Sequence, residues 1–198
     1  DVEVTIKNAT ITATGGTAGT GSSYGILAET TGTDKSAEVT INGNSVVRAN
    51  MTGAEGGDGE TISGTTVNRE SGIIFENGVG TVYGTVTLRE DLTVGADERL
   101  TIPQDAALTI PEGKTLTNSG VITNEGTLTN NGTLTIGQGG ALTGKPVTGN
   151  PLTYAVTVLT DGNGTASASG TSAAADDTVT LTATPDSGYH FDRWEVVS

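Results

Sequence analysis

The sequence predicts an all-β protein: a three-sided parallel β-helix of about five rungs, wound right-handed, followed by a small C-terminal β-rich module. Three observations carry this prediction. The chain is rich in Thr and Gly, with 30 Gly among 198 residues and only 4% aromatic residues. A short unit of an apolar residue, Thr and a third residue recurs along the chain. After residue 144 this repeat stops and the sequence changes character.

The repeat is clearest between residues 92 and 143, where its units follow one another at steps of eight or six residues. They are Leu92-Thr93-Val94, Leu100-Thr101-Ile102, Leu108-Thr109-Ile110, Leu116-Thr117-Asn118, Ile122-Thr123-Asn124, Leu128-Thr129-Asn130, Leu134-Thr135-Ile136 and Leu142-Thr143. Alternation of apolar and polar residues is the period of a strand, and the Gly, Asn, Asp and Pro between units supply turns. Strands this short fit the sides of a solenoid coil.

The N-terminal part repeats the pattern with longer loops, since Val4-Thr5-Ile6 recurs as Val39-Thr40-Ile41. Placing the units on three sides in turn predicts three columns of inward residues. They are Val4, Val39, Val86, Leu108 and Leu128; Ile11, Val46, Leu92, Leu116 and Leu134; and Ile26, Ile73, Leu100, Ile122 and Leu142. Each buried aliphatic side chain contributes roughly 1.5–3 kcal/mol, too little for one coil to fold alone, so we expect the coils to stack.

Two Pro and two Gly in or beside residues 145–151 indicate a linker. The predicted organisation is therefore a β-helix over 1–144, a linker over 145–151 and a module over 152–198. In the module we expect strands at 154–158, 165–169 and 177–183, with a hairpin turn at Asp161-Gly162-Asn163-Gly164. An aromatic-rich strand is expected at 189–196.

Residues 156–194 hold a Gly-Asn-Gly-Thr turn, the run 178–185 and the run Gly188-Tyr189-His190-Phe191-Asp192-Arg193-Trp194, in that order. In this they resemble part of the divergent internalin-type B-repeat of bacterial surface proteins. The resemblance implies a small β-grasp-like spacer, often in tandem on a cell surface, with no catalytic residues. Residues 71–144 also resemble the Thr/Asn-rich β-solenoid segments found beside such modules in large exported proteins of anaerobic gut bacteria.

Composition excludes several function classes. The net charge of −14 leaves no basic surplus for nucleic-acid binding, and close binding to polyanionic glycans would require Ca²⁺. The absence of Cys removes disulfides, zinc–thiolate sites and cysteine nucleophiles. No stretch approaches the ~20 apolar residues of a membrane-spanning helix.

His190 is the only histidine, so a Ser/His/Asp triad or a two-His metal site has no support, and we expect it to be structural. On a strand, Tyr189 and Phe191 would share one face, with His190, Asp192 and Trp194 on the other. The aromatic residues could form a platform for a sugar. We favour a role as the core of a small module.

Glu3 and Glu38 fall at equivalent outward positions of successive coils, with Thr85 next in the predicted column. Stacked carboxylates repel, so Ca²⁺ binding is one hypothesis, but solvated surface acids are the favoured one. Asp161-Gly162-Asn163-Gly164 is similar to a piece of a calcium loop but lacks the following acidic ligands. We expect no metal site and no cofactor.

The other polar residues of the solenoid also favour a structural role. Arg48, Arg89, Arg99 and Lys114 do not share a column, as a groove for acidic polysaccharides would require. Outward Thr is equally frequent on two sides, so no side is singled out as an ice-binding face. The preference of β-branched residues for strands explains the high Thr content. Asn118, Asn124 and Asn130 end three consecutive strands, where we expect them to serve turn geometry.

The sequence therefore predicts a non-enzymatic structural and adhesive segment of an exported bacterial cell-surface protein, extracellular or attached to the cell wall. Because the chain starts and stops within strand-like patterns, we interpret it as a piece of a longer protein. The second hypothesis is a carbohydrate-binding β-helix, with loops 15–23, 30–36 and 51–71 holding neutral glycans or calcium-bridged pectin. The third is a fragment of a polysaccharide lyase or glycoside hydrolase. Partners would be glycans or a host or cell-wall surface, and the oligomeric state stays open.

Overall fold

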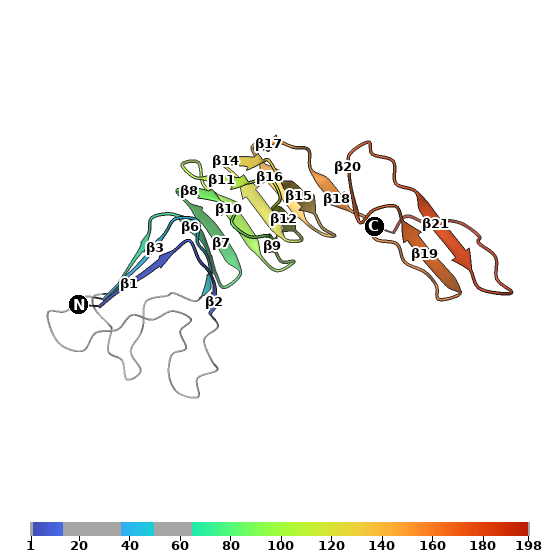
Figure 1. Ribbon diagram of the computed structural model, residues 1–198, viewed down its shortest axis with the longest axis horizontal. Coiled ribbons are helices and arrows are strands. Elements are labelled where there is room, and N and C mark those ends of the chain that lie inside the picture. The colour runs from blue at the N-terminus through green and yellow to red at the C-terminus, as the bar shows by residue number, and fades with distance from the viewer. Residues whose placement is uncertain (1, 14–36, 50–64, 198) are drawn as a thin grey trace, which may run out of the picture.

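The fold is all-β and consists of stacked strands, as Figure 1 shows. The computed structural model describes residues 2–13, 37–49 and 65–197. No helix occurs among them. The predicted class, a β-solenoid of parallel coils, is confirmed, although the coils are divided differently from the five rungs expected. Right-handed winding stays a prediction.

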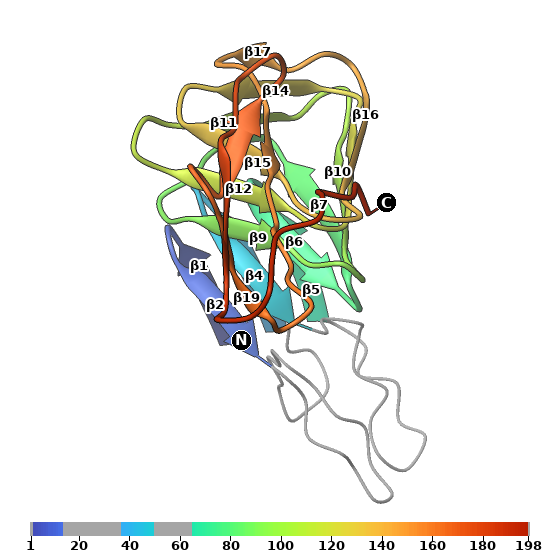
Figure 2. The same ribbon diagram turned by 90° about the vertical axis from the view of Figure 1, so that its right-hand side faces the viewer.

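The regular part of the solenoid is a three-sided prism built from β7 to β18. Its strands are β7 (Val79–Tyr83), β8 (Thr85–Thr87), β9 (Leu92–Val94), β10 (Arg99–Ile102), β11 (Ala107–Ile110), β12 (Thr115–Asn118), β13 (Val121–Asn124), β14 (Thr127–Asn130), β15 (Thr133–Ile136), β16 (Ala141–Gly144), β17 (Thr148–Gly149) and β18 (Thr153–Ala155). One side is β7-β10-β13-β16, the second β8-β11-β14-β17 and the third β9-β12-β15-β18. All neighbours in these three series are parallel. Figure 2 shows the coils stacked from β7 and β9 up to β17.

The predicted register of this prism is confirmed on all three sides. Leu108 lies between Val86 and Leu128. Leu116 lies between Leu92 and Leu134, and Ile122 between Leu100 and Leu142. Most of these side chains are buried in one hydrophobic cluster. The register could be predicted because the turns are short and nearly equal in length, so each strand can pair with only one strand in the coil above and one in the coil below.

Stacking continues beyond residue 144, into the segment expected as a linker. Strand β17 pairs with β14, and β18 pairs with β15. Backbone hydrogen bonds tie Lys145 N to Asn124 O and Asn150 N to Asn130 O, both at 2.6 Å. The two prolines are tolerated because they lie outside the short strand β17.

The N-terminal coils form a separate stack, which we call the N-stack (residues 2–13, 37–49 and 65–76). Its strands are β1 (Val2–Lys7), β2 (Thr10–Ala13), β3 (Ala37–Asn42), β4 (Val46–Ala49), β5 (Thr65–Arg69) and β6 (Gly72–Glu76). They make the parallel sheet β1-β3-β5 and the parallel series β2-β4-β6. The expected pairing of Val4 with Val39 is confirmed in the backbone register.

Four predicted N-terminal pairings are wrong, among them that of Val46 with Leu92, because β9 has β12 as its neighbour in the sheet. Val39 pairs with Val67 of β5 rather than with Val86, and Ile11 pairs with Val47 rather than Val46. Ile73 pairs with Val46, so these residues share a side, and it does not pair with Leu100. Because Val46 and Val47 are both apolar, the alternation of apolar and polar residues does not determine which of them points into a given core. Ile26 lies outside the described residues.

A hairpin between β6 and β7 joins the N-stack to the prism. Its turn, Asn77-Gly78, has positive φ at both residues (50° and 77°), the geometry of a two-residue type I′ turn. The pairing of β6 with β7 is antiparallel and completes a seven-stranded sheet of order β16-β13-β10-β7-β6-β4-β2. The single predicted stack is therefore two stacks that share one sheet and run in opposite strand directions.

The two stacks keep their cores on opposite faces of the shared sheet. Val46, Ile73 and Phe75 belong to the cluster that fills the prism. Val47 and Ile74, their immediate neighbours, belong to a second cluster with residues of β1 and β3. Alternate residues of a strand point to opposite faces, so β4 and β6 serve both cores.

The C-terminal module contains β19 (Gly164–Ala168), β20 (Ser172–Ala174) and β21 (Leu181–Pro185). Strand β20 pairs antiparallel with β18, and β19 pairs antiparallel with β21. The predicted hairpin across Asp161–Gly164 is wrong, since the strands on either side of that turn pair elsewhere. Residues 189–196 do not form the expected strand.

Candidate functional site

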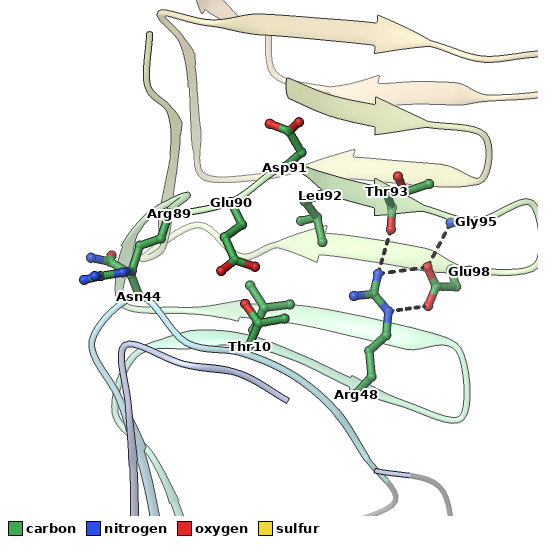
Figure 3. Close-up of a pocket in the computed structure, with 11 residues that line it drawn as sticks. Thr10, Asn44, Arg48, Arg89, Glu90, Asp91, Leu92, Thr93, Gly95 and Glu98 are labelled. Carbon is green, nitrogen blue, oxygen red and sulfur yellow. Dashed lines mark hydrogen bonds and ion pairs between the residues drawn. The ribbon is translucent and has the colours of Figure 1, made fainter. Parts of the chain in front are cut away.

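Arg48 links the N-stack to the prism through hydrogen bonds and an ion pair. It lies on the face of β4 that carries Val46, turned away from the N-stack core. Its Nε donates to Glu98 Oε1 at 3.0 Å, and its Nη2 donates to Glu98 Oε2 at 3.2 Å and to Thr93 O at 2.6 Å (Figure 3). The guanidinium carbon stands 4.2 Å from the centroid of the Phe75 ring. A forked ion pair over an aromatic face fixes the guanidinium in one orientation.

Glu98 is held in turn by the loop that precedes β10. Its Oε2 accepts a 2.8 Å hydrogen bond from Gly95 N, and its own N donates to Gly95 O at 2.9 Å. Partial burial raises the pKa of Glu98, but the hydrogen bonds from Arg48 and Gly95 and the charge of Arg48 outweigh it and hold that pKa below its usual range. The carboxylate is therefore ionised and engaged, which makes it a poor proton donor.

Asn44 forms a second link across the same junction. Its Oδ1 accepts a hydrogen bond from Thr87 N at 2.7 Å, and its N donates to Asn8 Oδ1 at 3.0 Å. The turns of two successive N-stack coils are thus connected to β8 of the prism.

Between these links lies an open cleft of about 330 Å³, which we call the junction cleft. Val46 and Leu92 line it with aliphatic groups, the Arg48–Glu98 pair stands at one end, and Arg89 and Glu90 stand at the other. Asp91, Thr10 and Asn44 complete the polar rim. Sequence reasoning placed Arg48 and Arg89 in different columns and missed the cleft, because it lies between stacks and not along a column.

The C-terminal module contains a second hollow, of about 430 Å³, beside β19 and β21. Its lining includes Tyr189, Phe191 and Trp194, which are 58%, 46% and 40% exposed. The rings of Phe191 and Trp194 are in contact, with centroids 5.2 Å apart at 52°. The expectation that these two residues occupy opposite faces of a strand is wrong. His190 is exposed in the same non-strand segment.

The order of strand, turn and aromatic run in this module agrees with one family. Residues 154–198 match the divergent InlB B-repeat domain. Domains of this kind are typical of bacterial surface proteins. No curated protein and no solved structure matches the chain. The B-repeat match begins at Tyr154, within the last strand of the prism.

The candidate metal ligands are not brought together. Glu3 and Glu38 are neighbours in the backbone register, but the next residue in their column is Thr66 and not Thr85; their side chains lie outside the described part. In the C-terminal module, hydrogen bonds from the backbone and side chain of Asn163 lower the pKa of Asp161, and the bond from Asn163 N is 3.1 Å long. Within residues 2–13, 37–49 and 65–197, no group of three or more His, Cys, Asp or Glu is placed to hold a metal ion.

Outward Thr residues form a ladder on each side of the prism. The ladders are Thr81-Thr101-Thr123-Thr143, Thr87-Thr109-Thr129-Thr148 and Thr93-Thr117-Thr135-Thr153. At the top of the stack their hydroxyls approach one another, as between Thr135 and Thr153 at 2.8 Å. Because every side carries such a ladder, none is marked as a recognition face.

Asn118, Asn124 and Asn130 are fully buried and have a structural role that differs from the expected one. None has positive φ. Each Nδ2 instead donates to a backbone carbonyl of the next coil: Ala141 O at 2.8 Å, Lys145 O at 3.0 Å and Asn150 O at 3.1 Å. Their positions are those of Val94, Ile102 and Ile110 one coil below. The sequence signal for this buried amide layer is the change from an aliphatic residue to Asn at the same position of three consecutive strands.

Among the described residues, no helix is long and apolar enough to cross a membrane.

Proposed function

We propose that this chain is a non-enzymatic structural and adhesive segment of an exported bacterial surface protein. The observation that carries the proposal is the continuity of the backbone from the prism into the B-repeat. Strand β18 pairs with β15 of the prism on one edge and with β20 of the B-repeat on the other. A hydrogen-bonded joint of this kind transmits load better than a flexible linker would, which suits a stalk.

Cell-surface exposure is the first test. Antibodies raised against the purified chain should label intact cells of the organism that makes it, and brief protease treatment of those cells should remove the label. A cytoplasmic protein of the same cells serves as the control. Labelling that requires lysis of the cells would contradict the proposal.

The non-enzymatic part of the proposal is supported by the state of Glu98. This carboxylate is ion-paired and hydrogen-bonded, so the junction cleft offers no proton donor on that side. We expect no release of unsaturated uronates from acidic polysaccharides and no cleavage of chromogenic glycosides. Turnover that is lost on substitution of a cleft residue would establish the lyase or hydrolase hypothesis instead.

A further inference from the structure

The junction cleft has hydrogen-bonding groups that the fold does not use. Of the three guanidinium nitrogens of Arg48, Nε and Nη2 are engaged, whereas Nη1 has no partner in the described part of the chain and points into the cleft (Figure 3). Toward the other end, the exposed Glu90 turns its carboxylate toward Thr10. A donor and a strong acceptor thus flank the aliphatic groups of Leu92 and Val46.

The charges of the cleft select against ionic ligands. Arg48 is neutralised by Glu98 at 3.0 Å, and Arg89 is followed directly in the chain by the carboxylates of Glu90 and Asp91. Two cationic and three acidic residues therefore line the cleft, within a chain whose net charge is −14. An anion would meet unfavourable potential, and a metal ion would find too few free carboxylate oxygens.

The apolar residues at the base of the junction cleft do not favour a purely apolar ligand. Leu92 and Val46 are only 4% and 8% exposed, so little apolar area is open, and the rim around them is polar. The volume of about 330 Å³ lies near the lower end of the ~300–1,000 Å³ range of small-ligand sites. A compact, uncharged ligand with both donors and acceptors on one edge and C–H groups on a face meets all these conditions.

We propose that the junction cleft binds a neutral, hydroxyl-rich ligand, namely a terminal sugar ring of an uncharged glycan. One ring hydroxyl accepts from Arg48 Nη1 and another donates to the Glu90 carboxylate, while the C–H face of the ring lies over the small apolar area that Leu92 and Val46 leave open. This inference rests on the adhesive part of the proposed function and gives it a ligand class. Because the walls come from both stacks, the bound sugar also bridges the junction and stabilises it.

The test is a titration of the ¹⁵N-labelled full chain with neutral sugars, followed by NMR. The panel contains galactose, mannose and N-acetylglucosamine, with their short β-linked oligomers, and galacturonate as the charged comparator. These neutral sugars differ in hydroxyl orientation and in the N-acetyl group, so their relative affinities rank the ring types that the cleft accepts. We expect saturable shifts confined to amides near residues 46–48 and 89–95, and weaker or no shifts with galacturonate.

Glu90→Gln is the decisive variant because Glu90 is exposed and no hydrogen bond or ion pair of the described structure depends on it. Losing the charged acceptor should weaken binding roughly tenfold. Glu112→Gln, at an exposed turn of another coil, is the matched control and should bind as the parent does. Absence of shifts with every neutral sugar, shifts located elsewhere, tighter binding of galacturonate, or equal binding by Glu90→Gln would each overturn the proposal. The titration uses no cells and the surface labelling uses no sugar, so failure of one is distinguishable from failure of the other.

Discussion

The N-stack and the prism use the same strand pattern but differ in how their coils are connected. In the prism, Leu108 of one coil pairs with Leu128 of the next, and the turns between strands are short throughout. In the N-stack, Val4 pairs with Val39 across a much longer stretch that contains residues 14–36. Short turns restrict which strand of the next coil each strand can reach, so they help to fix the register. Where the connections are long, the register depends on the side chains alone. The comparison teaches that coil regularity depends on connection length more than on strand sequence.

Removing a fully buried aliphatic side chain from each stack gives the largest effects and tests whether the stacks are independent. Leu116→Ala should cost roughly 2–5 kcal/mol, because it leaves a cavity in the column between Leu92 and Leu134. Hydrogen exchange measured by mass spectrometry should rise on all three sides of the prism. Ile41→Ala, equally buried, should raise exchange only within the N-stack. Exchange that rises equally in both stacks for either variant would show that they form one cooperative unit.

The Asn layer offers a contrast that exists only in the prism. Asn124→Ala removes the donor to Lys145 O and should cost about 1–2 kcal/mol, because the loss of this bond is partly offset by the removal of a buried Oδ1 that has no partner among the described residues. Thr123→Ala changes the outward neighbour on the same strand and should stay within about 0.5 kcal/mol. The midpoint of urea unfolding, at constant slope, measures both. Equal midpoints for the two variants would mean that the buried amide contributes no more than a surface hydroxyl.

The register of the prism was predictable and that of the N-stack was not, for reasons visible in single residues. Leu-Thr units at short, nearly equal steps admit one stacking. In the N-stack, Val46 and Val47 are both apolar, and each does point into a core, but into different ones. Residues Thr65–Arg69 contain a single apolar residue, Val67, so no alternation of apolar and polar residues predicts β5.

The β6–β7 hairpin and the buried Asn layer can be recognised in the sequence, whereas the junction cleft cannot. Asn77-Gly78 between apolar runs is a strong two-residue hairpin signal and marks the reversal of strand direction. The replacement of Val94, Ile102 and Ile110 by Asn one coil later marks the buried amide layer. The junction cleft had no such signal, since Arg48 and Glu98 share no register and meet only because two cores use opposite faces of one sheet.

Two ion pairs of similar exposure allow the junction to be compared with the interior of the N-stack. Arg48–Glu98 crosses the junction with side chains 26% and 22% exposed, whereas Arg69–Glu76 lies within the N-stack at 28% and 30%. Arg48→Ala should cost about 1–2 kcal/mol, because Thr93 O and the Phe75 face also lose their partner. Arg69→Ala should cost below about 1 kcal/mol. Thermal unfolding measures both losses of stability. Hydrogen exchange near residues 44–49 and 93–98 should rise only in Arg48→Ala. A larger loss of stability for Arg69→Ala would contradict the role of the Arg48–Glu98 pair in holding the two stacks together.

The smallest effect is the pH dependence of the junction, which follows from the lowered pKa of Glu98. A group whose pKa is lower in the folded state stabilises the fold above its unfolded pKa, for which the ordinary Glu value is 4.5, and this contribution fades as pH falls through the folded pKa. Because the pair is partly exposed, its contribution should remain below about 1 kcal/mol. Comparing urea unfolding of the parent chain with that of Glu98→Gln isolates this group, since the other carboxylates titrate alike in both. The stability difference should be constant near neutral pH and shrink in acid. A difference that persists unchanged well below the usual Glu range would mean that Glu98 acts at the junction through its hydrogen-bond acceptors, one of which the Gln amide replaces with a donor, rather than through its charge.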